Sequence, residues 1–152
     1  MAFCIHTNYH VEPLEQPSAA QFSAWVSTAL RCARKRSGEV CIALVDANEG
    51  RALNRQYREK DYATNVLSFP AELPRGVRSN LLGDLVLCAP VVADEALAQH
   101  KSRTDHYAHL CVHGTLHLLG YDHLDADAAE TMESMEIRIL AKLGIADPYA
   151  EF

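Results

Sequence analysis

Three histidines and one glycine stand at a spacing that restricts how residues 113–123, HGTLHLLGYDH, can fold. His113 and His117 are four positions apart, so on a helix their side chains share one face, with Cβ atoms about 5–6 Å apart. Gly120 tolerates the left-handed backbone conformation that ends a helix and turns the chain. We therefore expect a helix that ends at Gly120 and a turn that brings His123 back toward the other two histidines.

Such a turn would place three imidazoles around one point, where a metal ion can bind. Imidazole nitrogens reach zinc at about 2.0–2.1 Å, and three protein ligands with an open fourth position are typical of catalytic zinc sites. A histidine pair alone can also be solvated or hydrogen-bonded in a core, but the full HxxxHxxGxxH pattern has the metzincin spacing. The sequence therefore predicts one metal site, formed by His113, His117 and His123, on a helix of the C-terminal half.

The neighbours of these histidines are assigned supporting roles. His106 and His109 lie upstream on the same predicted helix and are expected to pack or to support the ligands. Asp122 either orients a ligand imidazole or is an acidic turn residue. Tyr121 is expected in the core.

The residue after the first histidine limits the reaction class. HExxH metalloproteases place a glutamate general base there, whereas this chain has Gly114. Peptide hydrolysis would need a base from elsewhere in the chain. RNA cleavage suits a site without a protein base, because the substrate supplies its own 2′-hydroxyl nucleophile. An arginine, with planar bidentate donors, is suited to bind the phosphate.

Hydrophobic periodicity and cap residues predict an α+β domain with about four strands and a helical C-terminal half. Strands are expected over 3–10, 40–45, 65–69 and 82–88. Helices are expected over about 18–37, 48–58, 90–100, 102–119 and 125–143.

Particular residues mark the ends of these elements. Ser18 and Gln21 form a capping box for the first helix, and Gly38 is its expected stop. Asn48 is the expected cap of the second helix, with Leu53 and Tyr57 pointing inward. Ser102 caps the fourth helix, and Asp125 or Asp127 caps the fifth, whose apolar stripe is Met132, Met135, Ile139 and Leu140. Pro70 directly after the third strand predicts an edge strand.

Length and composition indicate one globular domain spanning residues 1–152. No apolar run approaches the roughly 20 residues of a membrane span. The N-terminus lacks the basic start and apolar core of a signal peptide. Five cysteines stand without CxxC spacing, so reduced thiols are expected. We expect a soluble cytoplasmic protein with no membrane partner.

The charge is unevenly distributed along the chain. Residues 1–78 carry a net charge of +2 and residues 79–152 a net charge of −8. An acidic chain needs a local basic surface to bind nucleic acid. Ten residues could form such a surface or could simply be solvated: Arg31, Arg34, Lys35, Arg36, Arg51, Arg55, Arg58, Lys60, Arg75 and Arg78.

Four segments together resemble the YbeY family. They are LNRQYREKDYATNVLSFP (53–70), LLGDLVLC (81–88), HYAHLCVHGTLHLLGYDH (106–123) and LGIADPY (143–149). The resemblance implies a zincin-like single domain and a single-strand-specific, metal-dependent endoribonuclease. It also implies a role in ribosomal RNA maturation, at the 3′ end of the small-subunit RNA, and in ribosome quality control. The implied partners are ribosomal RNA and the small ribosomal subunit.

The resemblance also assigns roles to individual residues. The metal ligands of the family match His113, His117 and His123. Arg58 matches its active-site arginine, implied to bind the scissile phosphate and to act in catalysis; by position alone it would be a favourable helix C-terminal charge. Residues 64–69 match a strand beside the metal cleft. Asp84 matches an acidic position that either faces a ribosomal partner or starts a strand. Ala63 departs from the family's usual proline.

Two other functions stay open at this point. The chain could be a ribosome assembly factor with a structural metal, in which case His117→Ala should unfold it. It could also be a zinc hydrolase of peptides or small esters, which Gly114 disfavours. Three imidazoles favour one zinc ion per chain, although nickel or copper also suits them.

Overall fold

The structure, a computed structural model, describes residues 2–150. In that part of the chain four strands form one mixed sheet in the order β1-β2-β4-β3. The parallel strands are β1 (Ala2–Tyr9), β2 (Ser37–Val45) and β4 (Leu81–Cys88), and β3 (Val66–Pro70) runs antiparallel to β4. β3 is therefore an edge strand that ends at Pro70, as the proline predicted. The four expected strands are all present, and together they form a mixed sheet.

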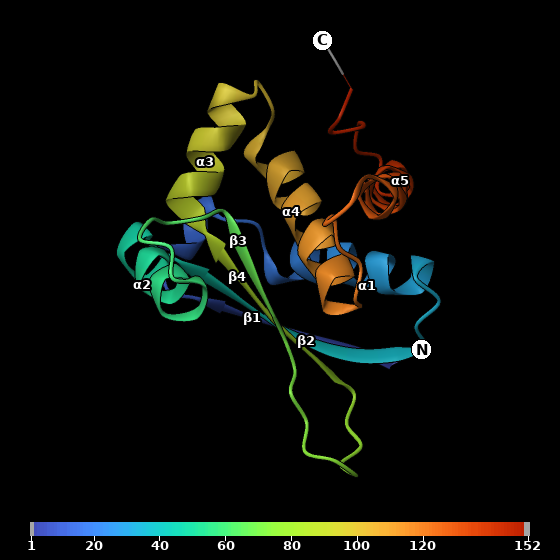
Figure 1. The fold of residues 1–152 in the computed structure, drawn as a ribbon. Helices are drawn as coiled ribbons and strands as arrows, with labels where there is room; N and C mark the ends of the chain where they lie inside the picture. Colours follow the sequence, from blue (N-terminus) through green and yellow to red (C-terminus); the bar gives the residue numbers. More distant parts are fainter. Residues whose placement is uncertain (1, 151–152) are drawn as a thin grey trace.

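Within residues 2–150 five α-helices accompany the sheet, which makes the fold α+β. Helices α1 (Ala19–Cys32), α4 (Arg103–Leu118) and α5 (Ala126–Lys142) lie on the same side of the sheet (Figure 1). Helix α2 (Ala47–Arg58) follows β2, α3 (Ala89–Ala98) follows β4, and a short 3-10 helix, η1 (Pro13–Glu15), precedes α1. Among residues 2–150, no helix combines the length and apolar character needed to cross a membrane.

The core lies between the sheet and the helices α1 and α4. Alternation along β2 directs Val40, Ile42 and Leu44 into it, while the intervening Cys41 stays half-buried. Phe22 of α1 meets Tyr107 of α4 edge to face, with ring centroids 5.9 Å apart. Such aromatic pairs add about 0.5–1.5 kcal/mol to the apolar area they bury. Helix α4 is thus fixed against the core along its length.

The first helix ends earlier than the sequence suggested. Helix α1 begins at the predicted capping box, in which Ser18 and Gln21 exchange hydrogen bonds. It ends at Cys32, not near Gly38, because Arg34 adopts a left-handed conformation with φ 64°. Gly38 lies in β2, where a Cβ atom would come within 2.8 Å of Leu82. The glycine there serves close packing, so its prediction as a helix stop was wrong.

The second helix also differs from expectation in its cap and its inward face. Asp46 caps it, accepting a hydrogen bond from the Glu49 amide, so the predicted Asn48 cap was two residues late. Tyr57 does not point inward: 59% of its surface is exposed, and its ring meets Phe69 at a centroid distance of 5.0 Å. The inward orientation predicted for Tyr57 was therefore wrong: the ring packs beside Phe69 of the edge strand β3 and stays largely exposed.

Candidate metal centre

Helix α4 carries the predicted histidine motif at its C-terminal end. Its start is the predicted Ser102 cap, which accepts a hydrogen bond from the Asp105 amide at 3.0 Å. The helix ends at Leu118, and Gly120 turns the chain with φ 97°. Ten residues of α4 are buried, so the helix holds its last turn rigidly beside the sheet. The expected order of helix, glycine and turn is confirmed.

The turn brings three imidazoles together. One candidate ligand nitrogen from each of His113, His117 and His123 lies within 4.8 Å of the other two. The Nε2 atoms of His113 and His117 are 3.0 Å apart. The ring of His123 is 5.2 Å from that of His117 and 5.7 Å from that of His113, centroid to centroid. This is the sole group of three or more potential metal ligands found within residues 2–150.

The protonation of this cluster suits a divalent metal. Burial lowers the pKa of His117, and the neighbouring His113 and His123 lower it further. A lowered pKa keeps the imidazole neutral at neutral pH, which is the form that binds metal. Neutral imidazoles hold at most two of the three nitrogens together by an N–H···N hydrogen bond, whereas one shared cation would use the lone pairs of all three. The donor set therefore fits a metal ion, and its chemistry favours zinc, nickel or copper over magnesium or calcium.

A buried glutamate of α5 supports the cluster, and the sequence analysis did not identify it. Glu136 is 0% exposed, and its Oε1 accepts a hydrogen bond from Nδ1 of His113. Its Oε2 accepts one from the Tyr149 hydroxyl and lies 3.4 Å from Nε2 of His109. Burial raises the pKa of this carboxyl, but the three donors outweigh burial and lower the pKa to about 2. Glu136 is therefore ionised at neutral pH.

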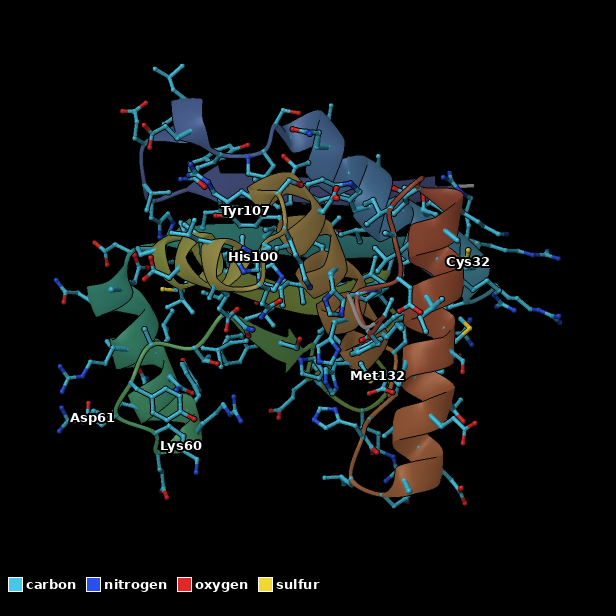
Figure 2. The ribbon with its side chains drawn as sticks, turned by 90° about the horizontal axis from the view of Figure 1, so that it is seen from above. Cys32, Lys60, Asp61, His100, Tyr107 and Met132 are labelled. Atoms are coloured by element: carbon cyan, nitrogen blue, oxygen red, sulfur yellow. The ribbon has the colours of Figure 1, made fainter. Side chains whose placement is uncertain are left out.

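A signal for Glu136 was present in the sequence. It falls inside the predicted apolar stripe of α5, between Met132 and Ile139, and both of these residues are buried. Figure 2 shows Met132 on the side of α5 that faces α4. A charged residue on such a face is rarely buried without partners. The stripe thus pointed to an internal acid, but not to the histidine that it contacts.

The candidate ligands open into a cleft of 690 Å³. Residues of β3 and the segment before it, 64–70, form one wall, as expected, and His109 and Tyr149 line the cleft beside the ligands. Arg58, at the end of α2, lines the same cleft. Arg51 on the same helix is paired with Asp61 at 2.7 Å. Within residues 2–150, Arg58 has no such pairing, so its guanidinium is available to a ligand.

Gly114 lies where α4 touches the sheet. A Cβ atom there would be 2.8 Å from Leu85 and 3.2 Å from the Ser68 hydroxyl, and Ser68 donates a hydrogen bond to the Gly114 carbonyl at 3.3 Å. A glutamate at this position would therefore collide with β3 and β4. The packing explains in physical terms why the peptidase base is missing from this motif.

The other residues around the motif have structural roles. His106 is buried, with Nε2 2.9 Å from Glu95, and Asn65 donates to the same carboxylate oxygen at 3.0 Å. This network joins α3, α4 and the start of β3. Asp122 accepts a hydrogen bond from the Leu124 amide at 3.2 Å, so it acts as a turn residue. His106 thus has the packing role that was expected, and His109 contacts Glu136 and Tyr149.

Known proteins resemble this chain along most of its length. The sequence profile of the family "Endoribonuclease YbeY" matches residues 7–144. A protein named Endoribonuclease YbeY from Cellvibrio japonicus (strain Ueda107) is 58% identical over 135 residues, covering 89% of this chain and 76% of the relative. Another of that name from Stenotrophomonas maltophilia (strain R551-3) is 61% identical over 138 residues, covering 88% of this chain and 85% of the relative.

One solved structure shares the fold. The solution structure of TM1509 from Thermotoga maritima matches with a TM-score of 0.59 and 21% sequence identity, covering 97% of this chain and 99% of that one. At this identity the match speaks for the fold alone. The profile match and the relatives at about 60% identity agree with the motifs described above, and the chain belongs to the endoribonuclease YbeY family.

Proposed function

We propose that this protein, an RNA-cleaving hydrolase by family, is a metal-dependent endoribonuclease whose metal ligands are His113, His117 and His123. The observation that carries the proposal is that these histidines and Arg58 line one cleft of 690 Å³. A metal bound there would polarise a phosphoryl oxygen of the substrate. Zinc, one ion per chain, is the metal that we propose, because three imidazoles with an open position suit it best.

Arg58 is the residue that we assign to the scissile phosphate. Its guanidinium can donate two parallel hydrogen bonds to a phosphate, and it lies at the C-terminal end of α2, facing the cleft. The positive charge would stabilise the additional negative charge that develops on the phosphoryl oxygens during cleavage. No side chain at position 114 supplies a base, so the substrate's 2′-hydroxyl is the proposed nucleophile.

Two aromatic residues at the rim of the cleft support a preference for single strands. Tyr57 and Phe69 both line it, and 59% of the Tyr57 surface is exposed. Aromatic rings stack on unpaired bases in single-stranded RNA, and bases inside a duplex are not accessible to them. We propose that Tyr57 contacts a base next to the phosphate that Arg58 binds.

We further propose that the substrate is ribosomal RNA, near the 3′ end of the small-subunit RNA, and that the protein acts in ribosome maturation and quality control in the cytoplasm. The support is the resemblance to the YbeY family and the position of the basic residues. Arg58 lines the cleft at the end of α2, and the exposed Lys60 follows it two residues later. They would give an otherwise acidic protein a local surface for RNA. We also propose that the fold is zincin-like, which the helix, glycine and turn of residues 113–123 support.

A cleavage assay tests the proposal. The substrate is a single-stranded fragment from the 3′ end of small-subunit ribosomal RNA, with a duplex of the same sequence for comparison. The native protein is compared with Arg58→Ala and His117→Ala, each checked for folding by circular dichroism. We expect cleavage of the single strand by the native protein alone. Equal cleavage by all three proteins would indicate a contaminating nuclease and contradict the proposal.

The same variants test the alternative function, a ribosome assembly factor with a structural metal. His113 of the cluster is hydrogen-bonded to the buried Glu136 of α5, so the cluster connects two helices of the fold. If the metal has a structural role there, the stability of the fold should depend on it. That function predicts that His117→Ala unfolds the domain and that removing zinc with a chelator lowers the thermal midpoint steeply. A folded His117→Ala protein without cleavage favours the endoribonuclease.

A further inference from the structure

We propose that Glu136 is a positioning residue that orients His113 for metal binding and, through the same carboxylate, docks the C-terminal segment against the cleft. The inference rests on the metal site of the proposed function and adds a residue from α5, an element that contributes none of the three ligands. The two oxygens of Glu136 have different partners. Oε1 faces α4, and Oε2 faces the segment that follows α5.

The geometry at Oε1 determines which nitrogen of His113 carries the proton. Glu136 accepts a hydrogen bond from the Tyr149 hydroxyl through Oε2, and as an acceptor at Oε1 as well it places the proton of a neutral His113 on Nδ1. The Nε2 atom then has a free lone pair, and it points at Nε2 of His117, 3.0 Å away. A histidine held in this way is ready to bind a metal through Nε2 without changing its tautomer.

Packing alone does not explain a carboxylate at this position. Glu136 is 0% exposed and stands among the buried Met132, Ile139 and Leu140. A buried charge is costly to desolvate, and a well-packed apolar side chain of similar volume is often as stable or more stable. The three converging donors reduce this cost. An apolar side chain would fill the space but would leave the ring of His113 without a partner.

The geometry at Oε2 ties the same carboxylate to the cleft wall. The Tyr149 hydroxyl donates to Oε2, and the ring of Tyr149 meets that of His109 edge to face at 5.4 Å. Tyr149 and His109 both line the cleft that holds the candidate ligands. Glu136 therefore connects three segments, α4, α5 and the C-terminal residues, at the point where the metal is proposed to bind.

Zinc affinity separates positioning from a purely structural role. We would compare Glu136→Gln, Tyr149→Phe and the control Glu130→Gln, in which an exposed acid of the same helix loses its charge. Affinity is measured by competition with a chromophoric chelator and corrected for the folded fraction seen by circular dichroism. Loss of such a supporting partner costs about 10–100-fold in metal affinity, and we expect this loss for Glu136→Gln. We expect no change for Glu130→Gln and less than about a threefold change for Tyr149→Phe, because that variant leaves the contact of His113 with Oε1 intact.

A measurement on the native protein covers the case in which Glu136→Gln fails to fold. Two-bond ¹H–¹⁵N correlations of the histidine rings in metal-free protein at neutral pH identify the tautomer of His113. We expect the proton on Nδ1. A proton on Nε2, or a Glu136→Gln protein that binds zinc as tightly per folded molecule as Glu130→Gln, would overturn the inference. Neither readout uses RNA, so the inference can fail while cleavage persists, and absence of zinc binding by the native protein would instead refute the proposed metal site.

Discussion

Two sides of the cleft are built in different ways: the histidine wall, formed by His109, His113 and His117 of α4, and the arginine wall, formed by Tyr57 and Arg58 of α2. The histidine wall belongs to the core: α4 has ten buried residues, and His113 is hydrogen-bonded to a fully buried glutamate. The arginine wall belongs to the surface: α2 buries only Gly50 and Asn54. Figure 2 shows Lys60 and Asp61 just beyond α2, on the side of the molecule away from α5. The metal wall is thus rigid before anything binds, while Arg58 is free to adjust.

The segment after α2 is nevertheless tied down at two points. Arg51 pairs with Asp61 at 2.7 Å, and the Asn54 side chain donates to the Tyr62 carbonyl at 2.8 Å. The first contact is exposed and contributes little to stability, whereas Asn54 is buried. Arg58, the last residue of α2, therefore lies next to a loop that is held in place but is outside the core. Metal binding needs fixed ligand geometry, but a long arginine can reach a phosphate from several positions.

The largest effect is expected from a change in the histidine wall. His117→Ala removes a candidate ligand, so zinc affinity should fall by more than the roughly 10–100-fold that loss of a supporting partner costs. Competition with a chelator measures this fall, and RNA cleavage should be lost with it. His6→Ala, which removes an exposed histidine of β1, is the matched control. Unchanged zinc binding by a folded His117→Ala protein would contradict the assignment.

The next largest effect is expected from a change in the arginine wall that leaves the histidine wall unaltered. Arg58→Ala should lower the rate of RNA cleavage by about 10²–10³-fold, the usual cost of removing a donor that stabilises a transition state, with zinc affinity unchanged. Arg58→Lys keeps the charge without the bidentate geometry, so its cleavage rate should lie between those of the native protein and Arg58→Ala. Arg55→Ala removes an exposed arginine of the same helix that does not line the cleft. A loss as large in Arg55→Ala as in Arg58→Ala would indicate general electrostatics.

A third change tests how tightly the histidine wall is packed. In Gly114→Ala the new methyl group would meet Leu85 at 2.8 Å and Ser68 at 3.2 Å. Overpacking of this kind costs about 1–3 kcal/mol. Urea denaturation of the metal-free protein measures the loss in the free energy of unfolding. An unchanged midpoint would mean that α4 can move away from β3, and the rigidity that we assign to this wall would be wrong.

The smallest effect concerns the aromatic rim of the arginine wall. Tyr57→Ala should weaken binding of a single-stranded RNA by about 1 kcal/mol, the low end for loss of one stacked base. Tyr57→Phe keeps the ring and should bind as the native protein does. Equilibrium binding followed by fluorescence anisotropy at fixed salt distinguishes the two. If Tyr57→Phe binds as weakly as Tyr57→Ala, the hydroxyl is responsible and the stacking role is refuted.

The ends of helices were predictable where a residue type has a well-defined local role, such as a helix cap or a glycine turn. The Ser18 capping box, the Ser102 and Asp125 caps and the Gly120 turn all appear as predicted, because each depends on neighbours within a few residues. The four strands were found from alternation and short apolar runs, but their order in the sheet was not. Gly38 and Tyr57 were misassigned because what surrounds them, Leu82 in one case and β3 in the other, is distant in sequence.

The sequence alone determined the family, through four motifs along the chain. It also determined the three candidate ligands, because one helix, a glycine and a turn within residues 113–123 bring them together. It linked Arg58 to this site only through the family resemblance. The tertiary structure placed Arg58 in the same cleft as the histidines, brought Glu136 and Tyr149 to them, and left no room for a side chain at Gly114. The reason is range: helical periodicity acts over a few residues, whereas these contacts join segments that only the packing of α4 against α5 and β3 brings together.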